Sequence, residues 1–447
     1  MKKKISRILI SAFSSGSGKT TFTMGLLRLL QKKGIKVSSY KCGPDYIDTM
    51  FHAKALGIPS RNIDLFLSSD NTVKNILAEA ENMAVIEGVM GFYDGIAFTD
   101  SASASHISSV TDTPCILIVD VKGKSATLKA LITGMLHYRK NNIKGIILNR
   151  ISKASYPVYK NMIESELPVK VFGYMPELNK ECTLKSRHLG LITAEEMADI
   201  NSIIDKVSEE LEKSIDLDCI IDLAEKAPDL EYDEQKINLI GRCRIGIAYD
   251  KAFCFHYADN IKVLEKMGAE IVYFSPLEDK ALPENLDGLI FYGGYPELYL
   301  EKLSANKSFI ESLKKVYNNK IPLIAECGGF MYISQSIDNV EMAALIKGRC
   351  TMTNKLQNFG YVEITAHKDS MLFKKGESMP AHEFHYSVID EPYSDCIMRK
   401  PKSLKSWQGV YLSDHVYAGY PHLYFLSNLK PAERFIIKAI HYNRDIE

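Results

Sequence analysis

One string near the start of the chain has the residue types and spacing needed to bind phosphate groups. The letters SSGSGKTT at residues 14–21 directly follow an apolar run and open an amphipathic stretch. In such a loop the glycines let backbone N–H groups converge on phosphate oxygens, and the following helix adds the positive end of its dipole. Lys19 would neutralise the β- and γ-phosphates of ATP, and the Thr20 hydroxyl would ligate Mg²⁺. The residues expected to bind ATP are Gly16, Ser17, Gly18, Lys19, Thr20 and Thr21.

The string departs from the usual phosphate-loop pattern at one place. Phe13 stands where G-x-x-x-x-G-K-[ST] has its first glycine. The alternative interpretation is a serine- and glycine-rich turn between a strand and a helix that binds no ligand. The strand before the string and the helix after it favour the phosphate loop, because that is the context the motif requires.

Two further strings place charged residues where apolar runs end. KCGPDYID covers residues 41–48, and IEGVMGFYDG covers residues 86–95. Ligands of open α/β sheets bind beyond the carboxyl ends of the strands, so these charges should gather near the phosphate loop. Glu87 has the place of an acidic Mg²⁺ partner, since carboxylates suit a hard cation. Asp45, Asp48 and Asp94 are further candidates, although each could instead form a turn or cap a helix.

The second half of the chain contains a candidate nucleophile. The string IAECGG at residues 324–329 ends an apolar run, and a helical pattern at 330–336 follows. A strand, a cysteine, small residues and a helix form a nucleophile elbow that exposes the thiol, here Cys327. The glycine pair at 293–294, which ends the preceding strand, could supply N–H groups to an oxyanion hole. The alternative for Cys327 is a buried structural thiol.

A cysteine nucleophile needs a base, and histidine is the usual one. The late candidates are four histidines, and the sequence alone does not choose among them: His382, His385, His415 and His422.

Alternating strands and helices must position these groups. Apolar runs recur in the first half, with helical patterns between them, which predicts a doubly wound, mostly parallel sheet covered on both faces. A helical pattern continues to about residue 225, and residues 227–242 are then mostly polar, contain a proline and lack periodicity. We therefore predict two α/β domains, 1–226 and 243–447, joined by a linker. The apolar runs of the first half span residues 5–13, 35–40, 83–89, 114–121, 144–149 and 169–175.

The bulk composition excludes several classes of protein. The 447 residues include 55 basic and 55 acidic residues, so no overall charge attracts nucleic acid or an anionic membrane. No apolar run reaches the roughly 18 residues of a membrane span. The nine cysteines form no C-x-x-C pair, which argues against a zinc site or a disulfide framework and for a reducing compartment, the cytoplasm. A homo-oligomer is left open.

Several strings together resemble one family, the cobyrinic acid a,c-diamide synthases. The likeness covers nearly the whole chain and is specific because GPDYID, GGYPEL and AECGG occur in the family's order. The strings already quoted are accompanied by RHLGL at 187–191, AYDKAFCFHYADN at 248–260, FSPLEDKALP at 274–283, GGYPEL at 293–298, AECGGFMY at 325–332 and HEFHYS at 382–387.

The resemblance implies a fold and a set of site residues. It implies a dethiobiotin-synthetase-like P-loop domain followed by a class I glutamine amidotransferase-like domain. Cys327 would be the glutaminase nucleophile and His422 its base, with Gly294 and Gly328 forming the oxyanion hole. Many amidotransferases have a glutamate two residues after the histidine, and this chain has Tyr424 there. The Mg²⁺ ligands would be Thr20, Glu87 and Asp45, and the residues binding the corrin substrate would be Lys41, Asp45, Tyr46, Asp48 and Asp94.

The reaction implied is the ATP-dependent conversion of the a and c carboxylates of cobyrinate into carboxamides, with glutamine or ammonia as nitrogen donor. Hydrogenobyrinate and nickel-sirohydrochlorin enzymes resemble the family too closely for these motifs to separate them. Cobyric acid synthase shares both domain types, but GPDYID and the short linker argue against it. A different class of protein, a P-loop ATPase switch with an inert amidotransferase-like domain, would often have lost the nucleophile or the base.

Overall fold

The computed structural model describes residues 1–178, 186–187, 190–191 and 200–444. The chain forms two compact units, Met1–Gln235 and Lys236–Glu447, and each is presented by itself. Both units are α/β and each contains a mostly parallel sheet, which confirms the predicted fold class. Among the described residues, no helix combines the length and the apolar character that crossing a membrane would require.

The first unit is built on a seven-stranded parallel sheet in the order β4-β3-β5-β2-β6-β7-β8. The central strands are almost wholly buried, because helices cover both faces and leave no side of the sheet to solvent. Since the strand order reverses around β2, the loops after β2, β3 and β5 meet at one edge. The strands are β2 Ser6–Ala12, β3 Val37–Cys42, β4 Ser60–Ile63, β5 Met83–Glu87, β6 Cys115–Asp120, β7 Ile143–Asn149 and β8 Lys170–Met175.

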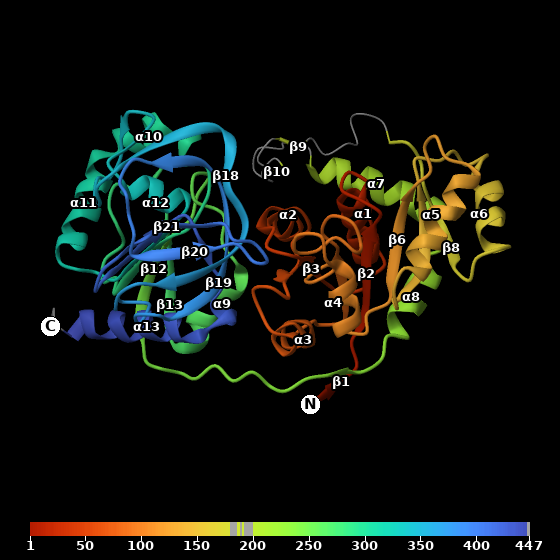
Figure 1. Cartoon of the computed structure of the whole chain (residues 1–447), viewed down its shortest axis with the longest axis horizontal. Coiled ribbons are helices and arrows are strands. Elements are labelled where there is room, and N and C mark those ends of the chain that lie inside the picture. Colours follow the sequence, from red (N-terminus) through yellow and green to blue (C-terminus); the bar gives the residue numbers. More distant parts are fainter. Residues whose placement is uncertain (179–185, 188–189, 192–199, 445–447) are drawn as a thin grey trace. The chain divides into compact units, whose positions relative to one another are not determined.

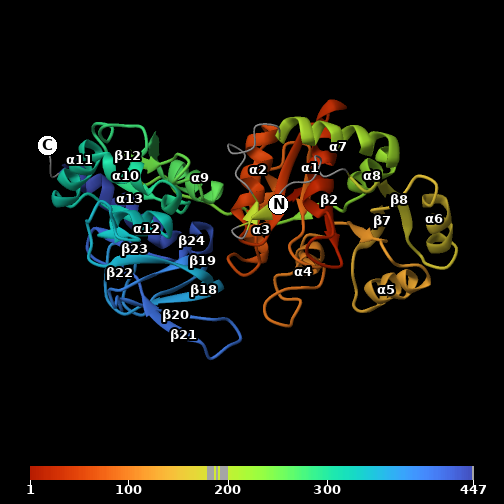
Figure 2. The same cartoon turned by 90° about the horizontal axis from the view of Figure 1, so that it is seen from above.

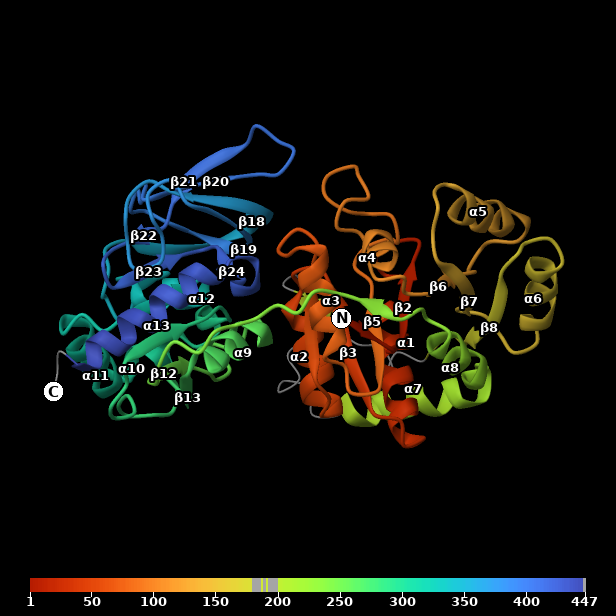
Figure 3. The same cartoon turned by 90° about the horizontal axis from the view of Figure 1, so that it is seen from below.

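Helices α1, α2 and α7 lie along one face of this sheet, and α4 and α5 lie along the other (Figures 2 and 3). Gly25 in α1 permits a close approach of α7, since a Cβ there would lie 2.6 Å from a methyl group of Val207. The helices of the unit are α1 Lys19–Lys32, α2 Tyr46–Leu56, α3 Asp70–Ala78, α4 Ala104–Val110, α5 Ala126–His137, α6 Tyr156–Glu164, α7 Ile200–Ser214 and α8 Leu217–Glu225.

Strand β4 was not predicted from the sequence. Three of its four residues, Ser60, Arg61 and Asn62, are polar, so no apolar run marks it. It forms the edge of the sheet and pairs only with β3. Its position rather than its composition makes it a strand, because the backbone of β3 offers a free row of hydrogen-bonding groups there.

The segment predicted as a linker starts within the first unit. Strand β11 (Leu230–Glu231) pairs with β1 (Lys2–Lys3) in an antiparallel ribbon. The carbonyl oxygen of Asp233 accepts hydrogen bonds from Asn71 and Asn75 at 2.8 and 2.7 Å. These contacts hold residues 230–235 on the first unit. A separate two-stranded ribbon joins β9 (Ser186–Arg187) and β10 (Gly190–Leu191).

The second unit has a six-stranded sheet in the order β13-β12-β14-β15-β23-β22, in which only β22 is antiparallel (Figure 1). Helices α9 and α13 pack on one face, and the residues of α10, α11 and α12 join the aromatic core on the other. The strands are β12 Cys243–Ala248, β13 Ala269–Phe274, β14 Gly288–Phe291, β15 Leu323–Glu326, β22 Tyr411–Leu412 and β23 Val416–Gly419. The helices are α9 Ala258–Met267, α10 Leu300–Ala305, α11 Lys307–Asn318, α12 Gly328–Ile333 and α13 Leu429–Arg444, with 3₁₀ turns η2 Pro296–Leu298 and η3 Phe425–Ser427.

A second, largely antiparallel sheet completes this unit. Its long strands β18 and β19 pair with each other, and β24 joins the far edge of β19 through the pair His382 and His422. The strands are β16 Ser336–Ile337, β17 Val340–Glu341, β18 Arg349–Ala366, β19 Ser378–Ile389, β20 Cys396–Arg399, β21 Ser406–Gly409 and β24 His422–Leu423.

Candidate functional site

The phosphate-loop string lies between β2 and α1, as its sequence requires. Gly16 and Gly18 have φ of 73° and 91°, in the region that favours glycine. A Cβ on Gly18 would lie 2.5 Å from the side-chain nitrogen of Asn149, which donates to the Ser17 carbonyl oxygen at 2.8 Å. Asn149, at the end of β7, thus holds the loop from a distant part of the chain. Sequence reasoning missed this residue, although a polar residue closing an apolar strand was the available signal.

Lys19 lies over the loop rather than pointing into solvent. Its ammonium donates to the carbonyl oxygens of Ser14 at 3.0 Å and Met90 at 2.6 Å. Burial and the nearby Lys41 ammonium lower the pKa of Lys19 to about 8. Both effects disfavour a positive charge, so an anion bound beside Lys19 would relieve them.

Glu87, at the carboxyl end of β5, is the centre of a buried polar cluster. Its Oε1 accepts from the Thr20 hydroxyl at 2.5 Å and from the Lys41 ammonium at 2.9 Å. Lys41 also pairs with Asp48, and His52 Nε2 lies 3.4 Å from Glu87 Oε2. Although burial acts in the opposite direction, Lys41 and His52 hold the pKa of Glu87 well below its usual range. The cluster therefore keeps one ionised carboxylate beside the phosphate loop.

The other acidic candidates of the first unit make local backbone contacts. Asp45 caps α2, accepting from the backbone N–H of Ile47 at 2.9 Å, and Asp94 Oδ2 accepts from the Gly91 N–H at 2.9 Å. Burial raises the pKa of Asp48 to about 7, although Lys41 opposes this effect. Tyr46 is buried in the first turn of α2. The described residues contain no group of three or more histidine, cysteine, aspartate or glutamate side chains arranged to hold a metal ion.

Arg187 and His188 are the charged residues of the RHLGL string. The backbone of Arg187 belongs to β9, while its side chain and His188 lie outside the described residues.

Cys327 occupies a strained turn between β15 and α12. Its φ of 48° and ψ of −105° fall outside the regions that a non-glycine residue ordinarily adopts. The backbone N–H of Cys327 donates to the Gly419 carbonyl oxygen at 2.8 Å, and a Cβ at Gly329 would lie 2.2 Å from the carbonyl oxygen of Phe291. This geometry is that of the predicted elbow, with the helix starting at Gly328 rather than at Phe330.

His422 and Cys327 border the same glycine. A Cβ placed on Gly293 would lie 3.4 Å from His422 Nε2, 2.6 Å from His422 Cε1 and 3.5 Å from Cys327 Cβ. Gly293 follows β14, Cys327 follows β15 and His422 follows β23, so three adjacent parallel strands deliver the three residues to one sheet edge. The absence of a side chain at Gly293 leaves room between the thiol and the imidazole.

Glu326, the residue before the nucleophile, provides the carboxylate that the sequence did not identify. Its Oε2 lies 3.5 Å from His422 Nδ1, and its Oε1 accepts from the Leu423 N–H at 3.2 Å. Burial raises the pKa of Glu326, and His422 opposes that rise. Tyr424 instead donates to Asp259 at 2.9 Å. The signal in the sequence was an acidic residue, Glu326, at the end of an apolar strand. This signal did not predict a place beside Cys327, because neighbouring residues of a strand usually point to opposite faces of the sheet.

The other late histidines have different surroundings. His385 stacks on Tyr420 with ring centroids 3.7 Å apart, and its Nδ1 lies 2.8 Å from the Ser387 carbonyl oxygen. His415 Nδ1 lies 2.8 Å from Asp414 before β23, at the end of that strand opposite Gly419. Burial and the neighbouring His422 lower the pKa of His382 to about 3, which favours a neutral ring. Of the four candidates, His422 alone is shown here to border the glycine beside Cys327.

The two glycines expected to form the oxyanion hole meet beside the thiol. A Cβ on Gly328 would lie 2.9 Å from the backbone nitrogen of Gly294. Within the described chain, neither glycine donates its N–H to a backbone carbonyl outside regular helix or strand pairing. Burial raises the pKa of Cys327 strongly, and the nearby Glu297 adds to the rise, although the Gly328 N–H opposes it. The thiol therefore needs a base to ionise.

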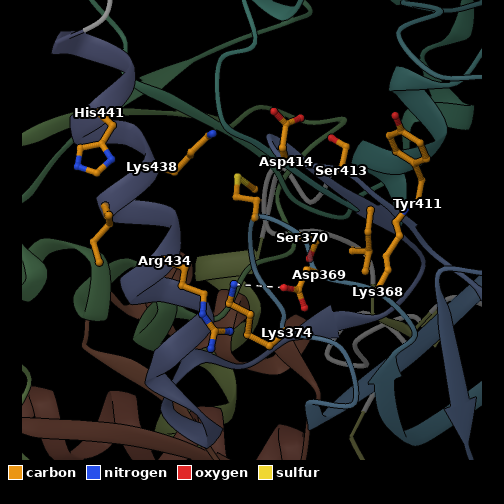
Figure 4. A pocket seen from close by; sticks show the side chains of 13 residues that line it. Lys368, Asp369, Ser370, Lys374, Tyr411, Ser413, Asp414, Arg434, Lys438 and His441 are labelled. Atoms are coloured by element: carbon orange, nitrogen blue, oxygen red, sulfur yellow. Dashed lines mark hydrogen bonds and ion pairs between the residues drawn. The ribbon is translucent and has the colours of Figure 1, made fainter.

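A cavity of about 720 Å³ in the second unit lies away from this site (Figure 4). It is lined partly by Ser413 and Asp414, which precede β23, whereas Cys327 contacts the last residue of that strand. Three of its cations already have carboxylate partners: Lys368 pairs with Asp395 at 2.9 Å, Lys374 with Asp369 at 3.4 Å, and Arg434 with Glu377 at 2.5 Å. We assign no chemistry to it.

Two family models match the chain. Residues 8–192 match the CobQ/CobB/MinD/ParA nucleotide binding domain. Residues 244–430 match the CobB/CobQ-like glutamine amidotransferase domain. The first match contains the phosphate loop and Glu87, and the second contains Cys327, Glu326 and His422.

The chain is similar over its full length to curated proteins named cobyrinate a,c-diamide synthase. The protein from Clostridium tetani is 40% identical over 95% of this chain and 98% of its own length. The protein from Caldanaerobacter subterraneus is 36% identical, covering 98% of this chain and 99% of its own length. A protein with this name from Thermoplasma volcanium is 37% identical, covering 99% of both chains.

Proposed function

The chain belongs to the cobyrinate a,c-diamide synthase family, ATP-dependent ligases that use glutamine as amide donor, and from this premise we propose which residues carry each half of the reaction. The first unit activates the substrate carboxylate with ATP. The second unit releases ammonia from glutamine. The observation that carries the assignment is the meeting of Cys327, His422 and Glu326 at one sheet edge, since it supplies the nucleophile, the base and the group that orients the base.

Carboxylate activation is a phosphoryl transfer. A carboxylate oxygen of cobyrinate attacks the γ-phosphorus of ATP, the bond to the β,γ-bridging oxygen breaks, and an acyl phosphate and ADP result. Lys19 and the backbone N–H groups of the loop would stabilise the negative charge on the transferred group. Because Lys19 is held between two carbonyl oxygens, it is positioned before the nucleotide arrives.

The residues beside the loop fit a magnesium ion. Mg²⁺ prefers oxygen ligands, and in nucleotide sites it takes few from the protein and the rest from phosphates and water. Thr20 and Glu87 supply a hydroxyl and an ionised carboxylate that already lie 2.5 Å apart. We propose that these two hold the metal, which would neutralise phosphate charge when bound. Asp45 is a weaker third candidate, because one of its oxygens caps α2.

Lys41 and Asp48 form a buried ion pair at the sheet edge where we place the corrin carboxylates. A substrate carboxylate would have to share the Lys41 ammonium with Asp48 and Glu87. Tyr46 and Asp94 lie on the α2 turn and the loop after β5, so they remain proposed substrate-binding residues on the same edge.

Ammonia release begins with the Cys327 thiol. His422 takes the thiol proton as sulfur attacks the glutamine carboxamide carbon, and the N–H groups of Gly294 and Gly328 stabilise the oxyanion. The carbon–nitrogen bond then breaks, and the imidazolium returns the proton to the departing nitrogen, which leaves as ammonia. Water hydrolyses the thioester to glutamate and restores the thiol. Ammonia attacks the acyl phosphate carbon, and phosphate leaves.

The test is mass spectrometry of cobyrinate after incubation with ATP, Mg²⁺ and glutamine carrying ¹⁵N in its side-chain amide. Two amidations should appear, each with one labelled nitrogen, together with ADP and glutamate. Competition among cobyrinate, hydrogenobyrinate and nickel-sirohydrochlorin then measures the macrocycle preference. An unmodified macrocycle alongside normal ATP hydrolysis would overturn the ligase assignment in favour of an ATPase with an inert amidotransferase-like unit.

We propose the cytoplasm as the site of action. All eight cysteines within the described residues are free thiols, which suits a reducing compartment.

A further inference from the structure

Glu297 lies beside the nucleophile but takes no part in the mechanism above. It belongs to η2, the 3₁₀ turn that directly follows the Gly293–Gly294 pair. The neighbouring Pro296 ring is so close to the elbow that a Cβ on Gly328 would lie 2.9 Å from its Cδ. The turn that carries Glu297 therefore packs against the first residue after Cys327.

The Glu297 carboxylate is an uncompensated charge near the thiol. Its hydrogen bond is to its own backbone N–H, and among the described residues no lysine, arginine or histidine forms an ion pair with it. Burial raises the pKa of Glu297 to about 7, and the nearby Asp338 adds to the rise. After burial, Glu297 is also the largest influence raising the pKa of Cys327. Glu297 is half-buried, and a carboxylate that opposes thiolate formation needs a compensating role.

Within the described part of the chain no cationic side chain pairs with Glu297, whereas the amide donor carries a positive charge. Glutamine carries an α-ammonium group at the end of its chain remote from the reacting carboxamide. His422 cannot serve both carboxylates, because its Nδ1 already faces Glu326 and its Nε2 lies on the side of Gly293.

We propose that Glu297 binds the α-ammonium group of glutamine and so selects the amide donor. The proposal rests on the assignment of Cys327 as the glutaminase nucleophile. Ion pairing would cancel the Glu297 charge felt by the sulfur, so donor binding would itself favour thiolate formation. The thiol would then become reactive when glutamine is bound and stay protonated in its absence.

The experiment compares glutamine with glutaramate, which has the same carboxamide and chain but lacks the amino group. Ammonia release is measured for the wild type, Glu297→Gln and a control, Glu301→Gln, whose side chain is exposed on α10. The wild type and the control should prefer glutamine. In Glu297→Gln, kcat/KM for glutamine should fall by about 10- to 100-fold. The value for glutaramate should not fall, because the charge that opposes thiolate formation is gone, so the preference collapses.

The possible failures are distinguishable. Undiminished preference for glutamine in Glu297→Gln, or an equal loss for both donors in a folded variant, would overturn the role of Glu297. If Glu297→Gln fails to fold, Glu297→Asp decides, because it keeps the charge and must keep the preference. A wild type that releases no ammonia from glutamine while still using ammonium salts would instead overturn the nucleophile assignment.

Discussion

At the scale of single residues, two carboxylates near one thiol, the buried Glu326 and the half-buried Glu297, have opposite surroundings. Glu326 faces His422 Nδ1 at 3.5 Å and accepts from a backbone N–H, so its charge has partners within the protein. Glu297 has no cationic partner among the described side chains. Residue type alone does not distinguish the two glutamates. Under our proposals, Glu326 positions the base and Glu297 binds the amide donor.

Cys327→Ala should impair synthesis with glutamine as nitrogen source but not synthesis with ammonia. Without the sulfur no thioester forms, so glutamine-dependent synthesis should fall by about 10⁴-fold or more. Ammonium salts at mildly alkaline pH should restore much of the activity, because carboxylate activation does not use this residue. Cys219→Ala, a change of the partly exposed thiol in α8, is the control. Full glutamine-dependent activity in Cys327→Ala would show the nucleophile assignment to be wrong.

Glu326→Gln should impair the same half-reaction through His422. The amide cannot stabilise the imidazolium as a carboxylate does, so kcat for ammonia release should fall by about 10²-fold or more with little change in KM. Glu326→Asp, which keeps the charge on a shorter arm, should recover part of the loss. The measurement is steady-state glutaminase kinetics alongside ammonia-dependent synthesis, which should be unaffected. A parallel loss of both activities would indicate a purely structural role.

Glu87→Gln should raise the Mg²⁺ requirement of the ligase. Glu87 is fully buried between Thr20 and Lys41, and a neutral amide is a poorer ligand for a hard cation. We expect kcat to fall roughly tenfold or more at limiting metal and to recover partly at high Mg²⁺. The control is Glu81→Gln, an exposed residue before β5. Superimposable Mg²⁺ titrations of a folded Glu87→Gln and the wild type would assign Glu87 a structural role.

At the scale of elements, parallel strands collect the reactive groups at their carboxyl ends in both units. In the first unit β2, β3 and β5 end at the phosphate loop, at Lys41 and at Glu87. In the second unit β14, β15 and β23 end one to three residues before Gly293, Cys327 and His422. The same geometry of parallel strands thus serves phosphate chemistry in one unit and thiol chemistry in the other.

Gly293→Ala tests how closely Gly293, Cys327 and His422 pack together in the second unit. The new methyl group would lie 2.6 Å from His422 Cε1, so the imidazole would have to move. A displacement of about 1 Å should lower glutaminase activity by roughly 10²-fold while sparing ammonia-dependent synthesis. Gly134→Ala in α5, where nothing lies within 4 Å of the new atom, is the control and should stabilise that helix by about 0.5–1 kcal/mol. Both effects are read from kinetics and thermal unfolding, and wild-type glutaminase activity in Gly293→Ala would refute the placement of His422.

At the scale of the whole molecule, each half-reaction has its own unit with its own core. The phosphate-loop cluster is confined to the first unit, and the Cys327 cluster is confined to the second. A defect in one cluster should therefore leave the chemistry of the other intact.

Mixing two inactive variants tests this independence. Lys19→Ala should lose amide synthesis with either nitrogen source, since no acyl phosphate forms, but should still release ammonia from glutamine. Cys327→Ala should show the reverse. A mixture of the two should regain glutamine-dependent synthesis through free ammonia, increasingly as the pH rises and less ammonia is protonated. Amide synthesis by Lys19→Ala alone would contradict the phosphate-loop assignment.

The sequence by itself determined the features that depend on short stretches of backbone. The phosphate loop and the elbow each need small residues at fixed positions between a strand and a helix, and both form where SSGSGKTT and AECGG predicted them. The α/β class also follows from local patterns, because strands buried on both faces read as continuous apolar runs.

Tertiary structure decided which distant groups meet. Glu326 reaches His422 because β15 pairs with β23 and β19 pairs with β24, and no local pattern specifies those registers. Asn149 supports the phosphate loop from 132 residues away, and β4 is a strand because β3 has a free edge there. Hydrogen bonds and ion pairs depend on positions in space to within an ångström, whereas the sequence constrains only separation along the chain. For that reason the elbow at Cys327 was predictable from its own turn, and the contact between Glu326 and His422 was not.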